Sequence, residues 1–86
     1  MYNLILEPSA QRDLKKFIGT VKSRIEVSLD KLKANPRPVA SKKLVGFKES
    51  WRLRVGGYRV LYEIDDKSRE LHVYRIELKG KDTYRR

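Results

Sequence analysis

The sequence predicts an α+β domain in which an N-terminal strand and a helical hairpin pack on a mainly antiparallel four-stranded sheet, in the order β-α-α-β-β-β. Two observations predict this class. Apolar residues recur every three to four positions as far as Pro36 and Pro38, and every two positions after Lys43. At 86 residues the chain has room for one core, so we expect a single domain over residues 1–86.

The N-terminal segment is expected to form a strand followed by a short helix. Residues 2–6 are a β-like run that Glu7 and Pro8 interrupt, and Pro8 suits the first turn of a helix. Leu14, Phe17 and Ile18 then recur at helical spacing until Gly19. The pattern therefore predicts a helix from Pro8 to Gly19.

A second amphipathic helix follows, for which Thr20 is the expected N-cap. Its apolar positions follow steps of three and four, and they are Val21, Ile25, Leu29 and Leu32. We expect this helix to end before Asn35, because Pro36 and Pro38 cannot continue it. The two helices make a hairpin.

Three strands are expected in the second half, over residues 50–55, 58–64 and 71–78, with a strand lead-in at Lys43 and Leu44. Gly56-Gly57 between the first two is a strong hairpin signal, and Asp65-Asp66-Lys67-Ser68 suits the next turn. Simple alternation in the last strand sets Leu71, Val73 and Arg75 against His72, Tyr74 and Ile76. This poor alternation is typical of a strand covered on both faces.

Arginines gather on one face of the predicted hairpin. In residues 51–55 the apolar side chains share one face, and Arg52 and Arg54 share the other. If the next strand pairs with this one, Arg59 lies close to both. Three guanidinium groups would repel one another unless an anion lies among them, and we expect a phosphodiester.

Composition restricts the class of partner. The formal net charge is +10 and 37% of residues are charged, which favours nucleic acid or an acidic protein over a neutral metabolite. The chain has no cysteine and one histidine, so we expect no disulfide, metal or cofactor. No apolar run approaches the roughly 18 residues of a membrane span, so we expect a cytoplasmic protein without membrane contact.

Three segments resemble the RelE/ParE superfamily of toxin–antitoxin toxins. They are Leu44-Val45-Gly46, residues 51–64 and residues 79–85, and the resemblance extends over nearly the whole chain. The family typically has an aromatic residue, alternating basic residues, a glycine turn and then Tyr-Arg-apolar-apolar-Tyr, as in Tyr58-Arg59-Val60-Leu61-Tyr62. Its C-terminal Tyr-Arg matches Tyr84-Arg85, but its His falls at Lys79 and its Arg at Gly80.

The resemblance implies one of two activities. The RelE branch cleaves messenger RNA in the ribosomal decoding site, whereas the ParE branch poisons DNA gyrase without known nuclease chemistry. A cognate acidic antitoxin, bound in a hetero-oligomer, inactivates both. The basic strand and the C-terminal tyrosine favour the RelE branch, with the ribosome and mRNA as further partners. A basic nucleic-acid-binding module without activity is the third hypothesis.

Metal-independent RNA cleavage needs a base for the 2′-hydroxyl, cations for the phosphorane and an acid for the leaving 5′-oxygen. Arginines suit the second task, Tyr84 could be the base, and Lys79 or Lys81 could be the acid. The candidate catalytic residues are Arg52, Arg54, Arg59, Lys79, Lys81 and Tyr84. The candidate RNA-binding residues are Lys42, Lys43, Lys48 and Arg85.

Each candidate also has a structural interpretation. Arg52 and Arg54 could form a solvated strand face, and Arg59 could pair with Glu63 or Glu77. Tyr84 could pack its ring on the sheet. The other aromatic residues of the second half, Trp51, Tyr58 and Tyr62, are expected in the core or at its rim, and His72 is expected to be structural.

Overall fold

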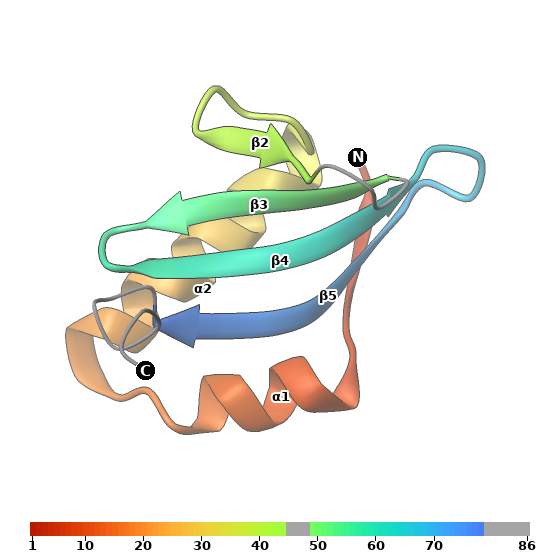
Figure 1. The fold of residues 1–86 in the computed structure, drawn as a ribbon. Coiled ribbons are helices and arrows are strands. Elements are labelled where there is room, and N and C mark those ends of the chain that lie inside the picture. Colours follow the sequence, from red (N-terminus) through yellow and green to blue (C-terminus); the bar gives the residue numbers. More distant parts are fainter. Residues whose placement is uncertain (45–48, 79–86) are drawn as a thin grey trace.

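In the computed structural model, which describes residues 1–44 and 49–78, the strands form one mixed sheet in the order β1-β5-β4-β3-β2 (Figure 1). The elements are β1 Asn3–Leu6, α1 Pro8–Lys15, α2 Gly19–Ala34, β2 Ser41–Lys43, β3 Ser50–Val55, β4 Tyr58–Asp65 and β5 Glu70–Leu78. The α+β class is confirmed. The described sheet has five strands rather than the expected four, because the lead-in near Lys43 is itself a strand.

Neighbouring strands are antiparallel except at one edge of the sheet. There β1 pairs in parallel with β5, so that Leu4 lies opposite Leu71. The β3–β4 hairpin turns at Gly56 and Gly57, and Gly56 has a φ of 62°, a left-handed conformation that glycine adopts without strain. Val55 lies opposite Tyr58 across this turn, which confirms the predicted hairpin.

Helix α2 crosses one face of the sheet and buries its apolar side against it (Figure 1). The core consists of apolar side chains from both helices and from β3, β4 and β5. It contains Ala10, Ile25, Leu29, Leu32, Leu53, Val60, Tyr62, Ile64, Leu71, Val73 and Ile76. Neither described helix is long and apolar enough to cross a lipid bilayer.

The helical hairpin departs from the sequence pattern at its turn. Helix α1 ends at Lys15 instead of Gly19, and α2 begins one residue before the expected cap Thr20. Phe17 still reaches the core edge, where its ring packs edge-on against Tyr58 with centroids 4.9 Å apart. Ile18 does not, and 80% of its surface is exposed, because the chain leaves the helix before that turn.

A β-bulge explains the irregular alternation of β5. Leu61 lies opposite Arg75 and Tyr62 opposite Val73, so Tyr74 is an extra residue on β5. The bulge turns Ile76 into the core with Leu71 and Val73, and it leaves Arg75 exposed. The simple alternation that grouped Arg75 with Val73 is therefore wrong.

Helix α1 lies along the part of the β5 edge that β1 does not pair (Figure 1). Pairing with β1 ends at Val73. Beyond it, the Ser9 hydroxyl donates to the Tyr74 carbonyl at 2.6 Å, and the Ile76 amide donates to Asp13 Oδ2 at 2.9 Å. Side chains of α1 thus satisfy backbone groups that a neighbouring strand would otherwise bond.

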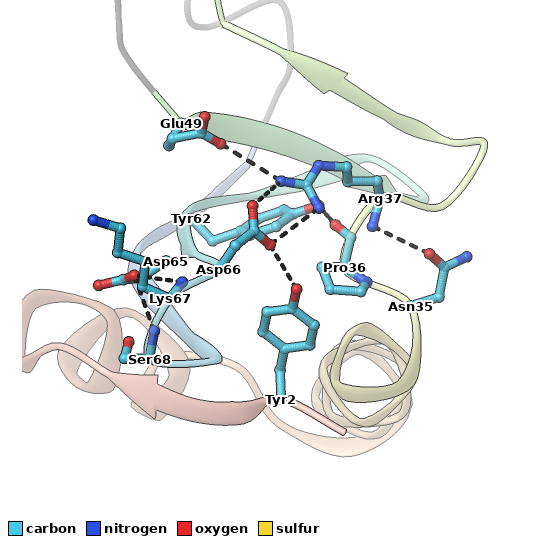
Figure 2. A network of polar contacts seen from close by, with 10 residues as sticks. All are labelled: Tyr2, Asn35, Pro36, Arg37, Glu49, Tyr62, Asp65, Asp66, Lys67 and Ser68. Atoms are coloured by element: carbon cyan, nitrogen blue, oxygen red, sulfur yellow. Dashed lines mark hydrogen bonds and ion pairs between the residues drawn. The ribbon is translucent and has the colours of Figure 1, made fainter.

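A polar network joins the β4–β5 turn to the N-terminal segment and to the loop after α2 (Figure 2). Arg37 Nη2 lies 2.9 Å from Asp66 Oδ2, and the Tyr2 hydroxyl donates to Asp66 Oδ1 at 2.6 Å. These hydrogen bonds, first from Arg37 and then from Tyr2, hold the pKa of Asp66 below its ordinary value. The Tyr62 hydroxyl donates to the Pro36 carbonyl at 2.6 Å, and burial raises the pKa of this phenol.

Candidate nucleic-acid interface

Four cationic side chains of β2, β3 and β4 lie on the sheet face opposite the one that packs against α2. Arg52 and Arg54 alternate with the core-facing residues of β3, and Arg54 lies directly opposite Arg59 on β4. Lys42 on β2 lies opposite Arg52. In Figure 1 this face is turned towards the viewer, with α2 behind the sheet. We call Lys42, Arg52, Arg54 and Arg59 the basic face.

The three predicted arginines are therefore neighbours in the structure, although like charges directly opposite one another destabilise a sheet. Arg54 is exposed and Arg52 is half-buried. Neither forms an ion pair with a carboxylate of the described residues, and Arg52 Nε is shielded from solvent without a hydrogen-bond partner among them. Such guanidinium groups are suited to binding an external anion through paired hydrogen bonds.

Arg59 has an internal partner. Its Nε and Nη2 atoms each lie 2.5 Å from Glu77 Oε2 on the neighbouring strand β5. Of the two glutamates that the sequence left open, the structure selects Glu77, because Glu77 is directly opposite Arg59 in the sheet register. Glu63 instead lies opposite Ser50 and His72.

The predicted lysines do not all join the basic face. Lys43 lies opposite Trp51, so the strand alternation places it on the other side of β2 from Lys42. Five further candidates, Lys48, Lys79, Lys81, Tyr84 and Arg85, lie outside the described residues, as does Gly80. The structure therefore leaves their roles as predictions.

One aromatic residue on this side of the sheet was missed. Trp51, Tyr58 and Tyr62 pack in or against the core, as their structural interpretation expects. The bulge instead places Tyr74 beside Arg75 on the side of the basic face, where its hydroxyl donates to Ser50 Oγ on β3 at 3.3 Å. Apolar core positions three residues apart, Val73 and Ile76, are the sequence signal that could have revealed it.

The same side of the sheet becomes acidic towards the β4–β5 turn. His72 lies there between two carboxylates, with Nδ1 2.8 Å from Glu7 and Nε2 3.1 Å from Glu70. These hydrogen bonds, the one to Glu7 first, raise the pKa of His72 above its ordinary value. The arrangement ties the start of α1 to β5, which fits the structural role expected for His72.

Comparisons with known proteins agree on one superfamily. The family model described as ParE toxin of type II toxin-antitoxin system, parDE, matches residues 4–82. The isolated E. coli RelE toxin superimposes with a TM-score of 0.83 at 23% identity, covering 94% of this chain and 87% of that chain. No curated protein sequence matches the chain significantly.

Two similar structures are toxin–antitoxin complexes. The match in the intact E. coli RelBE complex has a TM-score of 0.80 and 25% identity, covering 94% of this chain and 100% of that chain. The match in a RelBE complex from Mycobacterium tuberculosis has a TM-score of 0.79 and 25% identity, covering 90% of this chain and 96% of that chain.

Proposed function

We propose that this chain, which belongs to the ParE toxin family of the RelE/ParE superfamily, is a ribosome-dependent endoribonuclease. Its substrate is messenger RNA in the decoding site, and its action inhibits translation in the cytoplasm. The reaction is attack of the 2′-hydroxyl oxygen on the adjacent phosphorus, which breaks the bond from phosphorus to the 5′-oxygen; the 2′-hydroxyl loses a proton and the leaving 5′-oxygen gains one, without a metal or cofactor. The observation that carries the proposal is the grouping of Arg52, Arg54 and Arg59 on one open sheet face.

The arginines supply positive charge where the phosphorane develops negative charge. Guanidinium groups are planar cations that match the geometry of phosphate oxygens, and strands β3 and β4 fix the spacing between these three. Rigid strands preserve this spacing better than loops would, so the backbone does not have to rearrange when the substrate binds.

The remaining roles are assigned by chemistry and by the family resemblance. Tyr84 is the proposed base, and Lys79 or Lys81 the proposed acid. Lys42 extends the basic face towards the RNA backbone. Lys43, on the other side of β2, contacts ribosomal RNA rather than the scissile phosphate, and Lys48 and Arg85 add to the same electrostatic attraction.

A cognate antitoxin completes the module. The RelBE structures that match this chain are toxin–antitoxin complexes, and a chain of formal charge +10 is complementary to an acidic protein. We therefore expect an acidic antitoxin to cover the helical hairpin and the basic face in a hetero-oligomer, with affinity that falls as salt rises.

The second candidate function is poisoning of DNA gyrase. The family model that matches residues 4–82 carries the ParE description, which is the specific observation in its favour. The arrangement of the basic face favours the ribonuclease, because a protein that only binds gyrase needs no cluster of opposed arginines.

Controlled expression in a bacterium separates these functions. The ribonuclease produces new mRNA 5′ ends within codons, and only on translated messages. A gyrase poison produces DNA breaks and a DNA-damage response instead. An Arg59→Ala variant is the matched control, and salt-sensitive binding without either product would identify a passive nucleic-acid-binding module.

A further inference from the structure

The guanidinium of Arg59 already holds an anion that the chain itself supplies. A single carboxylate oxygen, Glu77 Oε2, accepts a hydrogen bond from Arg59 Nε at 2.5 Å and also lies 2.5 Å from Nη2. The Nε–Nη2 edge is one of the forks by which arginine grips a phosphate. In this structure it is filled by Glu77.

The other oxygen of the same carboxylate faces a second arginine. Glu77 Oε1 lies 3.6 Å from Arg75 Nε, and that nitrogen also lies 3.3 Å from Asp13 Oδ2. The Glu77 carboxylate thus lies between two guanidinium groups, as a bound phosphate would. Arg54, directly opposite Arg59, has no carboxylate of its own among the described residues.

The pair is built into the sheet. Arg59 and Glu77 are direct neighbours in the β4–β5 register, so no loop has to move for them to meet. Their side chains are only 28% and 23% exposed. Asp13, which restrains Arg75, is 12% exposed and is itself held by the Ile76 amide. These restraints keep the carboxylate at the guanidinium in the free protein.

We propose that Glu77 is an internal competitor of phosphate: it occupies the anion-binding edge of Arg59 in the free protein, and a phosphodiester has to displace it. The identity of that phosphodiester, RNA, rests on the proposed function. The competition itself requires only a phosphate. It lowers the affinity of the basic face for any free RNA, so binding depends on the additional contacts that a ribosome-bound message provides.

The central experiment compares Glu77→Gln with Glu63→Gln. Both substitutions remove one negative charge from the same side of the sheet, but Glu63 forms no ion pair with an arginine in the described residues. Binding of a fluorescent single-stranded RNA of about ten nucleotides is measured by anisotropy across a salt series. Glu77→Gln should tighten binding about three- to fivefold more than Glu63→Gln. It should also steepen the dependence of log K on log salt by about 0.7, the increment for one more phosphate contact on a single strand.

A double variant, Arg59→Ala with Glu77→Gln, tests whether Arg59 is the group that the loss of the Glu77 carboxylate makes available to phosphate. In an Arg59→Ala background, Glu77→Gln should produce no more gain than Glu63→Gln. Equal gains for both glutamines in the wild-type background would overturn the proposal. Weaker binding by a folded Glu77→Gln protein would also overturn it, because the carboxylate would then position Arg59 for its ligand. Thermal unfolding of each variant establishes that it is folded.

Inorganic pyrophosphate separates this proposal from the ribonuclease assignment. NMR of the Arg59 Nε–H resonance during titration reports displacement of Glu77 without any cleavage. A pyrophosphate-dependent shift that Glu77→Gln enhances supports the competition even if mRNA is not the substrate. No shift in either protein would overturn the competition while leaving mRNA cleavage to its own assay.

Discussion

Arg37 and Arg54 show two environments for the same side chain at opposite ends of one sheet. Arg37 lies between Asp66 and Glu49 (Figure 2). Its guanidinium carbon is also 5.4 Å from the Trp51 ring centre, so its charge is matched from several sides. Arg54 is exposed, lies opposite another arginine and has no carboxylate partner among the described residues. A charge that the fold pairs contributes to stability, whereas an exposed charge without a partner is available to bind an anion from outside.

The largest expected effect is that of Arg59→Ala on the proposed cleavage of mRNA. Losing a group that stabilises transition-state charge typically costs about 3–4 kcal/mol, so single-turnover cleavage of mRNA on purified ribosomes should slow about a hundredfold to a thousandfold. The fold should persist, since Arg59 lies outside the core. If the folded variant cleaves at the wild-type rate, Arg59 does not belong to the site.

The next effect concerns Tyr74, whose ring lies on the side of the basic face. If a nucleobase stacks on this ring, Tyr74→Ala should weaken RNA binding about 5- to 150-fold, from the roughly 1–3 kcal/mol of base–aromatic stacking. Tyr74→Phe should bind within about twofold of wild type, because the ring remains. Equal losses in the two variants would instead point to the hydroxyl and its hydrogen bond with Ser50.

Arg37→Ala tests the other side of the comparison. The variant loses its pairing with Asp66 and its contact with Trp51. Since these side chains are partly exposed, we expect a decrease of only about 2–5 °C in the unfolding midpoint. Ribosomal cleavage at a permissive temperature should be unchanged. A strong loss of activity without loss of stability would show that this end also contacts the substrate.

The smallest expected effect is a pH dependence of stability through His72. Glu7 and Glu70 stabilise its protonated form and raise its pKa in the folded state. This stabilisation is therefore complete below the unfolded pKa of about 6.5, and it is lost as the pH rises through the higher folded value. The unfolding midpoint of wild type should exceed that of His72→Gln by about 1–2 °C at pH near 6, and the difference should shrink by pH near 8.5. Glu63 is the other charged cross-strand neighbour of His72, so a Glu63→Gln, His72→Gln double variant separates its contribution.

Local patterns predicted the parts of this fold that local chemistry determines. The Gly56-Gly57 turn and the alternation of β3 depend on neighbouring residues, and the structure places the arginines on one face as that alternation predicts. The choice of Glu77 over Glu63 as partner of Arg59 depends on cross-strand register. Register depends on how two strands pair, so the sequence of one strand alone does not predict it.

The bulge at Tyr74 was missed for a related reason. Period two assumes one residue per position on each strand, and an extra residue reverses every side chain after it. Side chains from a distant helix, Ser9 and Asp13, bond the backbone at this bulge. The sequence of β5 shows that its alternation is irregular, but it does not show the contacts with α1 that accompany the bulge.

The pairing of β1 with β5 also determines the order in which the strands can join the sheet. The first strand has no partner in the sheet until β5 exists, because Asn3 pairs with Glu70 and Leu6 with Val73. During synthesis the β3–β4 hairpin can form as soon as it leaves the ribosomal tunnel, whereas β1 has to wait for residues 70–78. Glu77 arrives with that last strand. Arg59 therefore leaves the tunnel before its internal counter-anion does, and the pair forms only when β5 joins the sheet.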